Sequence, residues 1–219
     1  MIYNFDFRKS LGQNFLIDDS IVDNIANAID YKENNMIIEI GPGSGNLTKK
    51  LLKKADFVLL YEIDTRLKKI LSRELLEFNN YDIIWDDFLY RDVKEDLKKY
   101  NYKNIYIVAN LPYYITTPIV SKFVMETIPA NEIVIMIQKE VAERLSAPVG
   151  TKEYGQITVL LNYYFNIEKI IDVDRKAFYP TPNVDSAVIK MIRKDNLEVL
   201  TSFEHFDKLV KDSFQFLKC

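Results

Sequence analysis

The stretch MIIEIGPGSGNLTKKLLKK, residues 36–54, decides the fold of this chain. It begins with a mostly apolar run of the kind that forms a buried strand. Three glycines follow within five residues (Gly41, Gly43 and Gly45), and after them leucine and lysine recur at helical spacing. A strand, a tight turn and a helix in this order are typical of a unit of a parallel α/β sheet.

The rest of the chain repeats this alternation of apolar runs and helical segments. It predicts a doubly wound, mostly parallel sheet with helices on both faces. Helices are expected to start at Ser20 and at Thr117–Pro118, where a capping residue precedes a helical pattern. Two of these apolar runs, at residues 166–173 and 186–192, flank the loop FYPTPNV. We expect them to pair as an antiparallel hairpin at one sheet edge. The further runs are FVLLY (57–61), YDIIW (81–85), NIYIVA (104–109), EIVIMI (132–137), NIEKIIDV (166–173) and SAVIKMI (186–192).

Composition sets the broad class. A chain of 219 residues that is 48% hydrophobic can bury one core, with at most a small appendage. No apolar run approaches the roughly 18 residues of a membrane span, and Cys219 is the only cysteine, which rules out an intrachain disulfide. We expect a cytoplasmic monomer without a metal site, since His205 is the only histidine. The net charge of -3 does not itself indicate nucleic-acid binding.

The glycine turn is the first candidate for ligand binding, because ligands of such sheets bind beyond the carboxyl ends of the strands. Glycines let the backbone turn sharply and approach a ligand closely. The spacing is GxGxG with Pro42 inside it, whereas dinucleotide-binding turns have GxGxxG. A ligand without a pyrophosphate is therefore favoured; the alternative is a plain tight turn.

The next two strand ends carry acidic residues. Glu62 lies 21 residues after Gly41, where a carboxylate can accept hydrogen bonds from both ribose hydroxyls. In WDDF, Asp87 could accept from an adenine amino group and Phe88 could offer its ring face, although Asp86 is an equally good candidate on chemistry alone. A solvent-exposed glutamate is the alternative for Glu62.

The fourth strand end, NLPYYITTP (110–118), suits an amino-bearing base. The side-chain carbonyl of Asn110 and the backbone carbonyl of Leu111 could accept the two hydrogens of adenine N6 and favour a pyramidal, more nucleophilic nitrogen. Pro112 stiffens the backbone between them, and Tyr113 can stack on the base. The alternative is a turn before a helix with surface tyrosines.

With KSLGQNFLID (9–18), QKEVAERL and AFYPTPNVDSAV added, the chain resembles the small-subunit ribosomal RNA adenine dimethyltransferases, the kasugamycin-sensitivity family. The resemblance runs from about Lys9 to Ile192. It implies a class I methyltransferase domain over 1–194, with seven strands and an antiparallel last pair. The implied activity is N6,N6-dimethylation of two adjacent adenosines near the 3′ end of small-subunit rRNA. The implied cofactor is S-adenosyl-L-methionine, and the partner is the small ribosomal subunit.

The resemblance also implies the roles of individual residues, and it selects Asp87 over Asp86. Phe178 would cover the face of the base opposite Tyr113. The implied target-base residues are Asn110, Leu111, Pro112, Tyr113 and Phe178, and the implied cofactor residues are Asn14, Leu16, Gly41, Gly43, Glu62, Asp87 and Asn110.

The family carries a basic C-terminal helical domain that helps it dock on the ribosome. Here residues 195–219 are expected to form only the start of that domain, and this puts docking on the native substrate in question. Three other classes remain open: a large-subunit enzyme of the erythromycin-resistance type, a non-catalytic ribosome assembly factor, and an NAD-dependent oxidoreductase. DNA adenine and protein glutamine methyltransferases also use an Asn-Pro-Tyr type corner.

Overall fold

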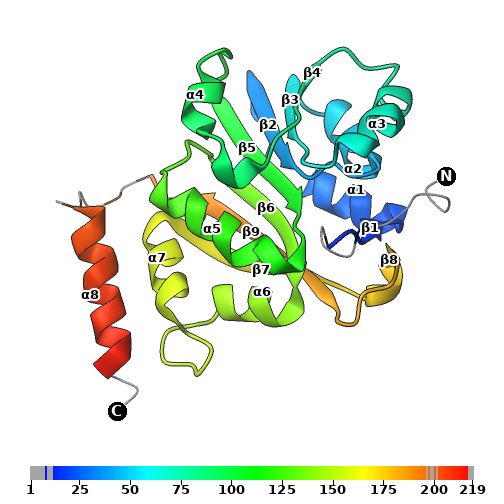
Figure 1. Ribbon diagram of the computed structural model, residues 1–219. Helices are drawn as coiled ribbons and strands as arrows, with labels where there is room; N and C mark the ends of the chain where they lie inside the picture. The colour runs from blue at the N-terminus through cyan, green and yellow to red at the C-terminus, as the bar shows by residue number, and fades with distance from the viewer. Residues whose placement is uncertain (1–7, 9–11, 196, 198–199, 201, 217–219) are drawn as a thin grey trace.

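A seven-stranded sheet with helices on both faces forms the centre of the molecule (Figure 1). The computed structural model describes residues 8, 12–195, 197, 200 and 202–216. The strands are β1 (Phe15–Leu16), β2 (Asn35–Ile40), β3 (Phe57–Tyr61), β4 (Tyr81–Ile84), β5 (Asn104–Asn110), β6 (Glu132–Gln138), β7 (Phe165–Val173), β8 (Phe178–Tyr179) and β9 (Ser186–Arg193). The helices are α1 (Asp19–Asn27), α2 (Asn46–Leu52), α3 (Lys68–Glu74), α4 (Val93–Leu97), α5 (Thr116–Met125), α6 (Lys139–Leu145), α7 (Gln156–Tyr164) and α8 (Phe203–Phe216).

The order of the large sheet is β4-β3-β2-β5-β6-β9-β7. The first five strands in this order are parallel, while β9 runs antiparallel to both β6 and β7. The predicted doubly wound sheet and its antiparallel last pair are therefore confirmed. The pair closes one edge of the sheet as predicted, with β7 at the edge and β9 between β7 and β6.

Alternation along the strands divides the core into two layers. Met36 and Ile38 on β2 face a cluster that includes side chains of α4, α5, α6 and α7, while Ile37 faces a cluster that includes side chains of α1, α2 and α3. Strands buried on both faces explain why the apolar runs in the sequence are nearly continuous.

Both predicted helix starts are wrong by two residues. Helix α1 is capped by Asp18, whose carboxylate accepts from the backbone N–H of Ser20, so the aspartate and not the serine is the N-cap. Helix α5 starts at Thr116, which places Pro118 inside its first turn. The first-turn N–H groups have no helical partner, and a proline there removes nothing the helix needs.

A second, two-stranded sheet joins distant parts of the chain. In it β1 pairs antiparallel with β8, with Phe15 opposite Tyr179 and Leu16 opposite Phe178. We call residues 12–16 the strap. Through this pairing, the strap is held beside the segment that carries Phe178, on the side of the sheet where the parallel strands end (Figure 1).

Helix α8 lies against α7 at the far side of the molecule from the strap (Figure 1). Phe203, Phe206 and Val210 pack on the core through α7, and Gln156 Nε2 donates to Asp207 Oδ1 at 3.1 Å. The division of the chain near residue 194 stays a prediction. None of the described helices is long and apolar enough to cross a membrane.

Candidate active site

A cavity of about 350 Å³ opens at the carboxyl ends of β2, β3, β4 and β5. The strap and Phe178 complete its wall. The structure brings all eleven predicted site residues to this one cavity. They are Asn14, Leu16, Gly41, Gly43, Glu62, Asp87, Asn110, Leu111, Pro112, Tyr113 and Phe178.

In the glycine turn after β2, Gly41 borders open space and Gly43 is in close contact with the strap. Gly41 has φ +71°, and a Cβ at this position would meet no atom within 4 Å, so the backbone here borders open space. Gly43 has φ +56°, and a Cβ there would come within 2.5 Å of the Phe15 ring. A side chain at Gly43 would therefore displace the strap.

Glu62 directly follows β3 and is buried. Its Oε2 accepts from the Gly43 N–H at 3.2 Å and its Oε1 from the Asp64 N–H at 2.8 Å. Burial raises the pKa of this carboxyl, and the two backbone hydrogen bonds oppose the rise. These bonds fix the carboxylate at the edge of the glycine turn, where a ligand diol can donate to it.

Asp86 and Asp87 both line the cavity but have different partners. Asp87 Oδ1 accepts from the Leu89 N–H at 2.9 Å, and no described residue donates to its Oδ2. Asp86 accepts from the Asp87 N–H and lies 3.4 Å from the guanidinium of Arg91. Both carboxylates accept from a backbone N–H, but only Asp87 keeps an oxygen to which no described residue donates.

Asn110 is the last residue of β5 and is oriented by the strap. Its Nδ2 donates to the carbonyl of Asn14 at 3.4 Å, which leaves Oδ1 as an acceptor to which no described residue donates. The Leu111 N–H donates to the carbonyl of Met136 on β6 at 3.0 Å and fixes the next peptide. Both predicted acceptors thus sit on backbone anchored to the sheet.

Two aromatic rings complete the site. Tyr113 begins a 3₁₀ turn after Pro112, and its hydroxyl is 2.8 Å from Ser186 Oγ. Burial raises the pKa of this phenol, so the hydroxyl is neutral near pH 7. The Phe178 ring is buried and packs in the same cluster as Phe15 and Val173. It reaches the cavity as part of the wall.

Glu39 is a cavity residue that the sequence reasoning did not single out. Only 2% of this residue is exposed, and Oε2 has no hydrogen-bond partner among the described residues. Burial raises the pKa of Glu39 to about 8; nearby Thr48 acts in the opposite direction without making a hydrogen bond of good geometry. An acid within a buried strand, two residues before the glycine turn, is the signal in the sequence that could have identified it.

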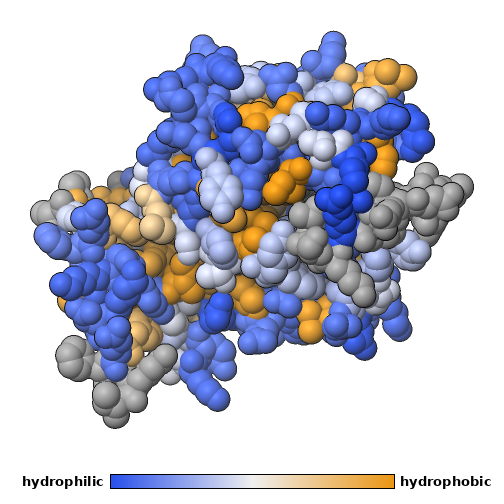
Figure 2. Space-filling model, viewed as in Figure 1, coloured by the Kyte–Doolittle hydropathy of each residue, from blue (hydrophilic) through white to orange (hydrophobic). Residues whose placement is uncertain are grey.

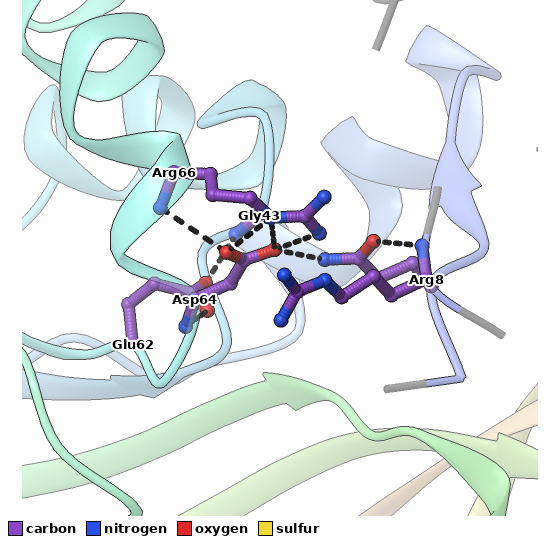
Figure 3. Close-up of polar contacts among 6 residues, drawn as sticks. Arg8, Gly43, Glu62, Asp64 and Arg66 are labelled. Atoms are coloured by element: carbon purple, nitrogen blue, oxygen red, sulfur yellow. Dashed lines mark hydrogen bonds and ion pairs between the residues drawn. The ribbon is translucent and has the colours of Figure 1, made fainter. Parts of the chain in front are cut away.

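A group of polar contacts holds the strap in place, and the sequence analysis did not predict these contacts (Figure 3). Gln13 Nε2 donates to Asp64 Oδ2 at 2.7 Å, and Gln13 Oε1 accepts from the Arg8 N–H at 2.8 Å. Arg66 lies 2.6 Å from the same Asp64 oxygen and, as the main cause, lowers the pKa of Asp64 to about 2. The strap is therefore bonded to the turn that carries Glu62, as well as to Asn110.

The rim of the cavity is apolar and exposed. Figure 2 shows hydrophobic atoms near the middle of this otherwise mainly hydrophilic face. Ile63, Tyr90 and Tyr114 line the cavity and are all exposed, Tyr90 by 87%. No group of three or more metal-ligating side chains occurs in the part of the chain that the structure describes. The exposed rim of the cavity therefore suits contact with planar, uncharged groups.

The sheet order, the glycine turn and the acid after the second parallel strand together define a class I S-adenosylmethionine-dependent methyltransferase. The sequence model for ribosomal RNA adenine dimethylases matches residues 4–216. The chain belongs to this ribosomal RNA adenine dimethylase family.

Individual relatives agree with this assignment. The chain is 44% identical to ribosomal RNA small subunit methyltransferase A of Staphylococcus aureus, over 97% of its own length and 72% of the relative's. Among solved structures, it is similar to a dimethyladenosine transferase from Plasmodium falciparum, with a TM-score of 0.79, 32% identity, and coverage of 90% of this chain and 69% of that one. It is also similar to the 23S rRNA methyltransferase ErmE, with a TM-score of 0.78, 30% identity, and coverage of 92% and 79%.

Proposed function

We propose that this protein transfers methyl groups from S-adenosyl-L-methionine to N6 of two adjacent adenosines near the 3′ end of small-subunit rRNA, giving N6,N6-dimethyladenosine. The observation that carries the proposal is the orientation of Asn110. Its amide nitrogen is bonded to the strap, and its Oδ1 acceptor is left at the same cavity as the glycine turn and Glu62.

The residues around the glycine turn fit the proposed cofactor. Glu62 holds two carboxylate oxygens where a ribose diol could donate, and Asp87 keeps Oδ2 for an amino group of adenine. The open space at Gly41 admits close approach of a ligand, and the unpartnered Oε2 of buried Glu39 offers a further polar contact. When bound there, the cofactor would supply an electrophilic methyl group on its sulfonium sulfur, with the thioether as the leaving group.

The chain's own residues prepare that nitrogen. The lone pair of N6 is delocalised into the adenine ring, so the amine is a weak nucleophile. Asn110 Oδ1 and the Leu111 carbonyl accept its two hydrogens and hold the nitrogen toward the methyl donor, while Tyr113 and Phe178 enclose the ring. Positioning of this kind lowers the barrier without a strong base, because the alkylated amine releases its proton readily to water.

Large-subunit methylation is the second candidate, since ErmE has nearly the same TM-score as the dimethyladenosine transferase. The 44% identity to a small subunit methyltransferase over nearly the whole chain favours the small subunit. The partner proposed here is therefore the small ribosomal subunit, with the protein acting as a monomer in the cytoplasm.

The deciding experiment is transfer of labelled methyl from S-adenosylmethionine to small ribosomal subunits that lack the modification, with mass analysis of the digested adenosines. Large subunits serve as the parallel sample. We expect dimethyladenosine in the small subunit alone. Label in the large subunit alone would support the second candidate. Cofactor binding without transfer to either subunit would favour a role in assembly.

A further inference from the structure

Ser186 has a hydroxyl that the proposed chemistry does not use. It is the first residue of β9, paired with Gln138 on β6 and with Val173 on β7, and only 1% of it is exposed. Among the described residues, its side chain makes one hydrogen bond, between Ser186 Oγ and Tyr113 Oη at 2.8 Å. A buried hydroxyl thus reaches from the interior of the sheet to a ring of the active site.

Tyr113 needs such an anchor. It begins a 3₁₀ turn, and its ring is only half-buried at the cavity wall. An aromatic side chain on a turn can occupy several rotamers unless packing or a hydrogen bond selects one. The partner hydroxyl belongs to a strand that lies between two others, so it offers a fixed reference point.

The same hydroxyl lies at the end of the segment that carries Phe178. This segment leaves β8, turns through residues 180–185 and enters β9 at Ser186. At its start, β8 is fixed by pairing with the strap. A hydrogen bond from Ser186 to Tyr113 therefore connects the element bearing one ring of the predicted base site to the other ring.

We infer that Ser186 is a positioning residue that sets the orientation of the Tyr113 ring relative to Phe178, and thereby the slot that holds the target adenine. The inference rests on the proposed function. Ser186 touches neither the base nor the cofactor in this role; it acts through the Tyr113 hydroxyl. Loss of one neutral hydrogen bond predicts about a fivefold fall in kcat/KM for RNA.

A double-mutant cycle tests this dependence. Ser186→Ala and Tyr113→Phe each remove one side of the bond and keep the ring. We expect each to lower kcat/KM for small subunits about fivefold, and the double variant to be no slower than either single one. The affinity for S-adenosylmethionine, measured by calorimetry, should stay unchanged in all three. Independent, multiplying effects in the double variant, or a weakened cofactor affinity in Ser186→Ala, would overturn the inference.

A matched control and a second readout keep the result interpretable. Ser146→Ala removes a serine hydroxyl that, among the described residues, donates to the backbone carbonyl of Ala142 alone, away from the cavity, and should leave kcat/KM unchanged. The NMR ring signals of Tyr113, assigned by their loss in Tyr113→Phe, should shift and broaden in Ser186→Ala; unchanged signals would contradict the inference. Absence of methyl transfer by the unmodified protein would reject the proposed function, while the ring signals would still decide whether Ser186 orients Tyr113.

Discussion

The two ends of the large sheet treat buried polar groups in opposite ways. At the amino end, Lys190 Nζ lies 2.8 Å from Asp30 Oδ2 and 3.1 Å from Glu132 Oε2. Asp30 also accepts a hydrogen bond at its backbone carbonyl from the hydroxyl of Tyr106. The buried ammonium of Lys190 is thus paired with the buried carboxylate of Glu132, and the exposed carboxylate of Asp30 adds a second contact. Buried ions remain in a folded core when they are paired in this way.

At the carboxyl end, acceptors are held in place but not satisfied. Glu39 Oε2, Asp87 Oδ2 and Asn110 Oδ1 receive no hydrogen bond from the described residues. Glu39 is buried, whereas Asp87 and Asn110 are half-buried. An unpaired buried acceptor costs stability, and native proteins keep few of them. The comparison indicates that the amino end is organised for folding and the carboxyl end for a ligand. The predictions below test that difference, from the largest expected effect to the smallest.

Asn110→Ala should have the largest effect. Removing a preorganised group at the reacting atom typically lowers kcat by two to three orders of magnitude, and we expect a fall of that size with little change in thermal stability. The control is at the other end of the same strand: Asn104 donates from Nδ2 to the carbonyl of Glu33 at 2.8 Å. Asn104→Ala should keep kcat. Unchanged methyl transfer in Asn110→Ala would remove this residue from the reaction.

Lys190→Met should lower the stability of the protein and leave kcat unchanged, which is the reverse of the effect expected for Asn110→Ala. The change leaves the buried carboxylate of Glu132 without its charged partner, although the Asp30 N–H still donates to it. We expect a loss of about 3 kcal/mol in the free energy of unfolding. At temperatures where the variant is folded, kcat should be normal. Urea denaturation measures the loss, with Lys98→Met at an exposed ion pair as the control. If Lys190→Met were stable but had a low kcat, the conclusion that the amino end of the sheet is organised for folding would be wrong.

Glu39 should make the stability of the ligand-free protein depend on pH. Its pKa is about 8 in the folded chain and near 4.5 when unfolded, so the folded state binds the proton more tightly. The contribution of Glu39 to stability should therefore be greatest below pH 4.5 and should fall as the pH rises toward 8. Between pH 5 and pH 7 the fall is on the order of 2 kcal/mol.

Glu39→Gln should remove that slope, because glutamine has no proton to lose. Denaturation midpoints of both proteins at pH 5, 6 and 7 provide the measurement. The same slope in Glu39→Gln would show that another group causes it.

Glu62→Ala should weaken cofactor binding by roughly 30-fold, about 2 kcal/mol, because the ribose would lose a charged acceptor. Calorimetry with S-adenosylmethionine measures the affinity. Glu74→Ala, which removes a carboxylate bonded to Lys49 and Arg73, is the matched control and should bind normally. An unaltered affinity in Glu62→Ala would place the ribose elsewhere.

Local patterns were enough to predict the sheet and most of the cavity. Runs such as MIIEI and EIVIMI are apolar on both faces, and a parallel sheet gathers their carboxyl ends by topology alone. The Asn110 amide and the Glu62 carboxylate follow such runs directly. For these positions, knowing the strands was enough to predict that the residues would meet.

Contacts between distant segments could not be predicted in this way. The pairing of Phe15 with Tyr179 and the bond from Gln13 to Asp64 join segments that no local periodicity connects. From the residues alone, Asn14 and Phe15 looked like an ordinary loop, and only the resemblance assigned Asn14 a role. Asp18, Asp19 and Ser20 are all residue types that cap helices well, so propensity did not distinguish the cap at Asp18 from one at Ser20.

The strap has one consequence for how the two ligands of the cavity influence each other. It is bonded to Asp64 beside Glu62 and to Asn110, and it pairs with the strand of Phe178. One short segment thus touches both proposed subsites, and any coupling that it transmits between cofactor binding and adenosine binding is reciprocal. If the bound cofactor changes the affinity for adenosine by a given factor, bound adenosine changes the affinity for the cofactor by the same factor.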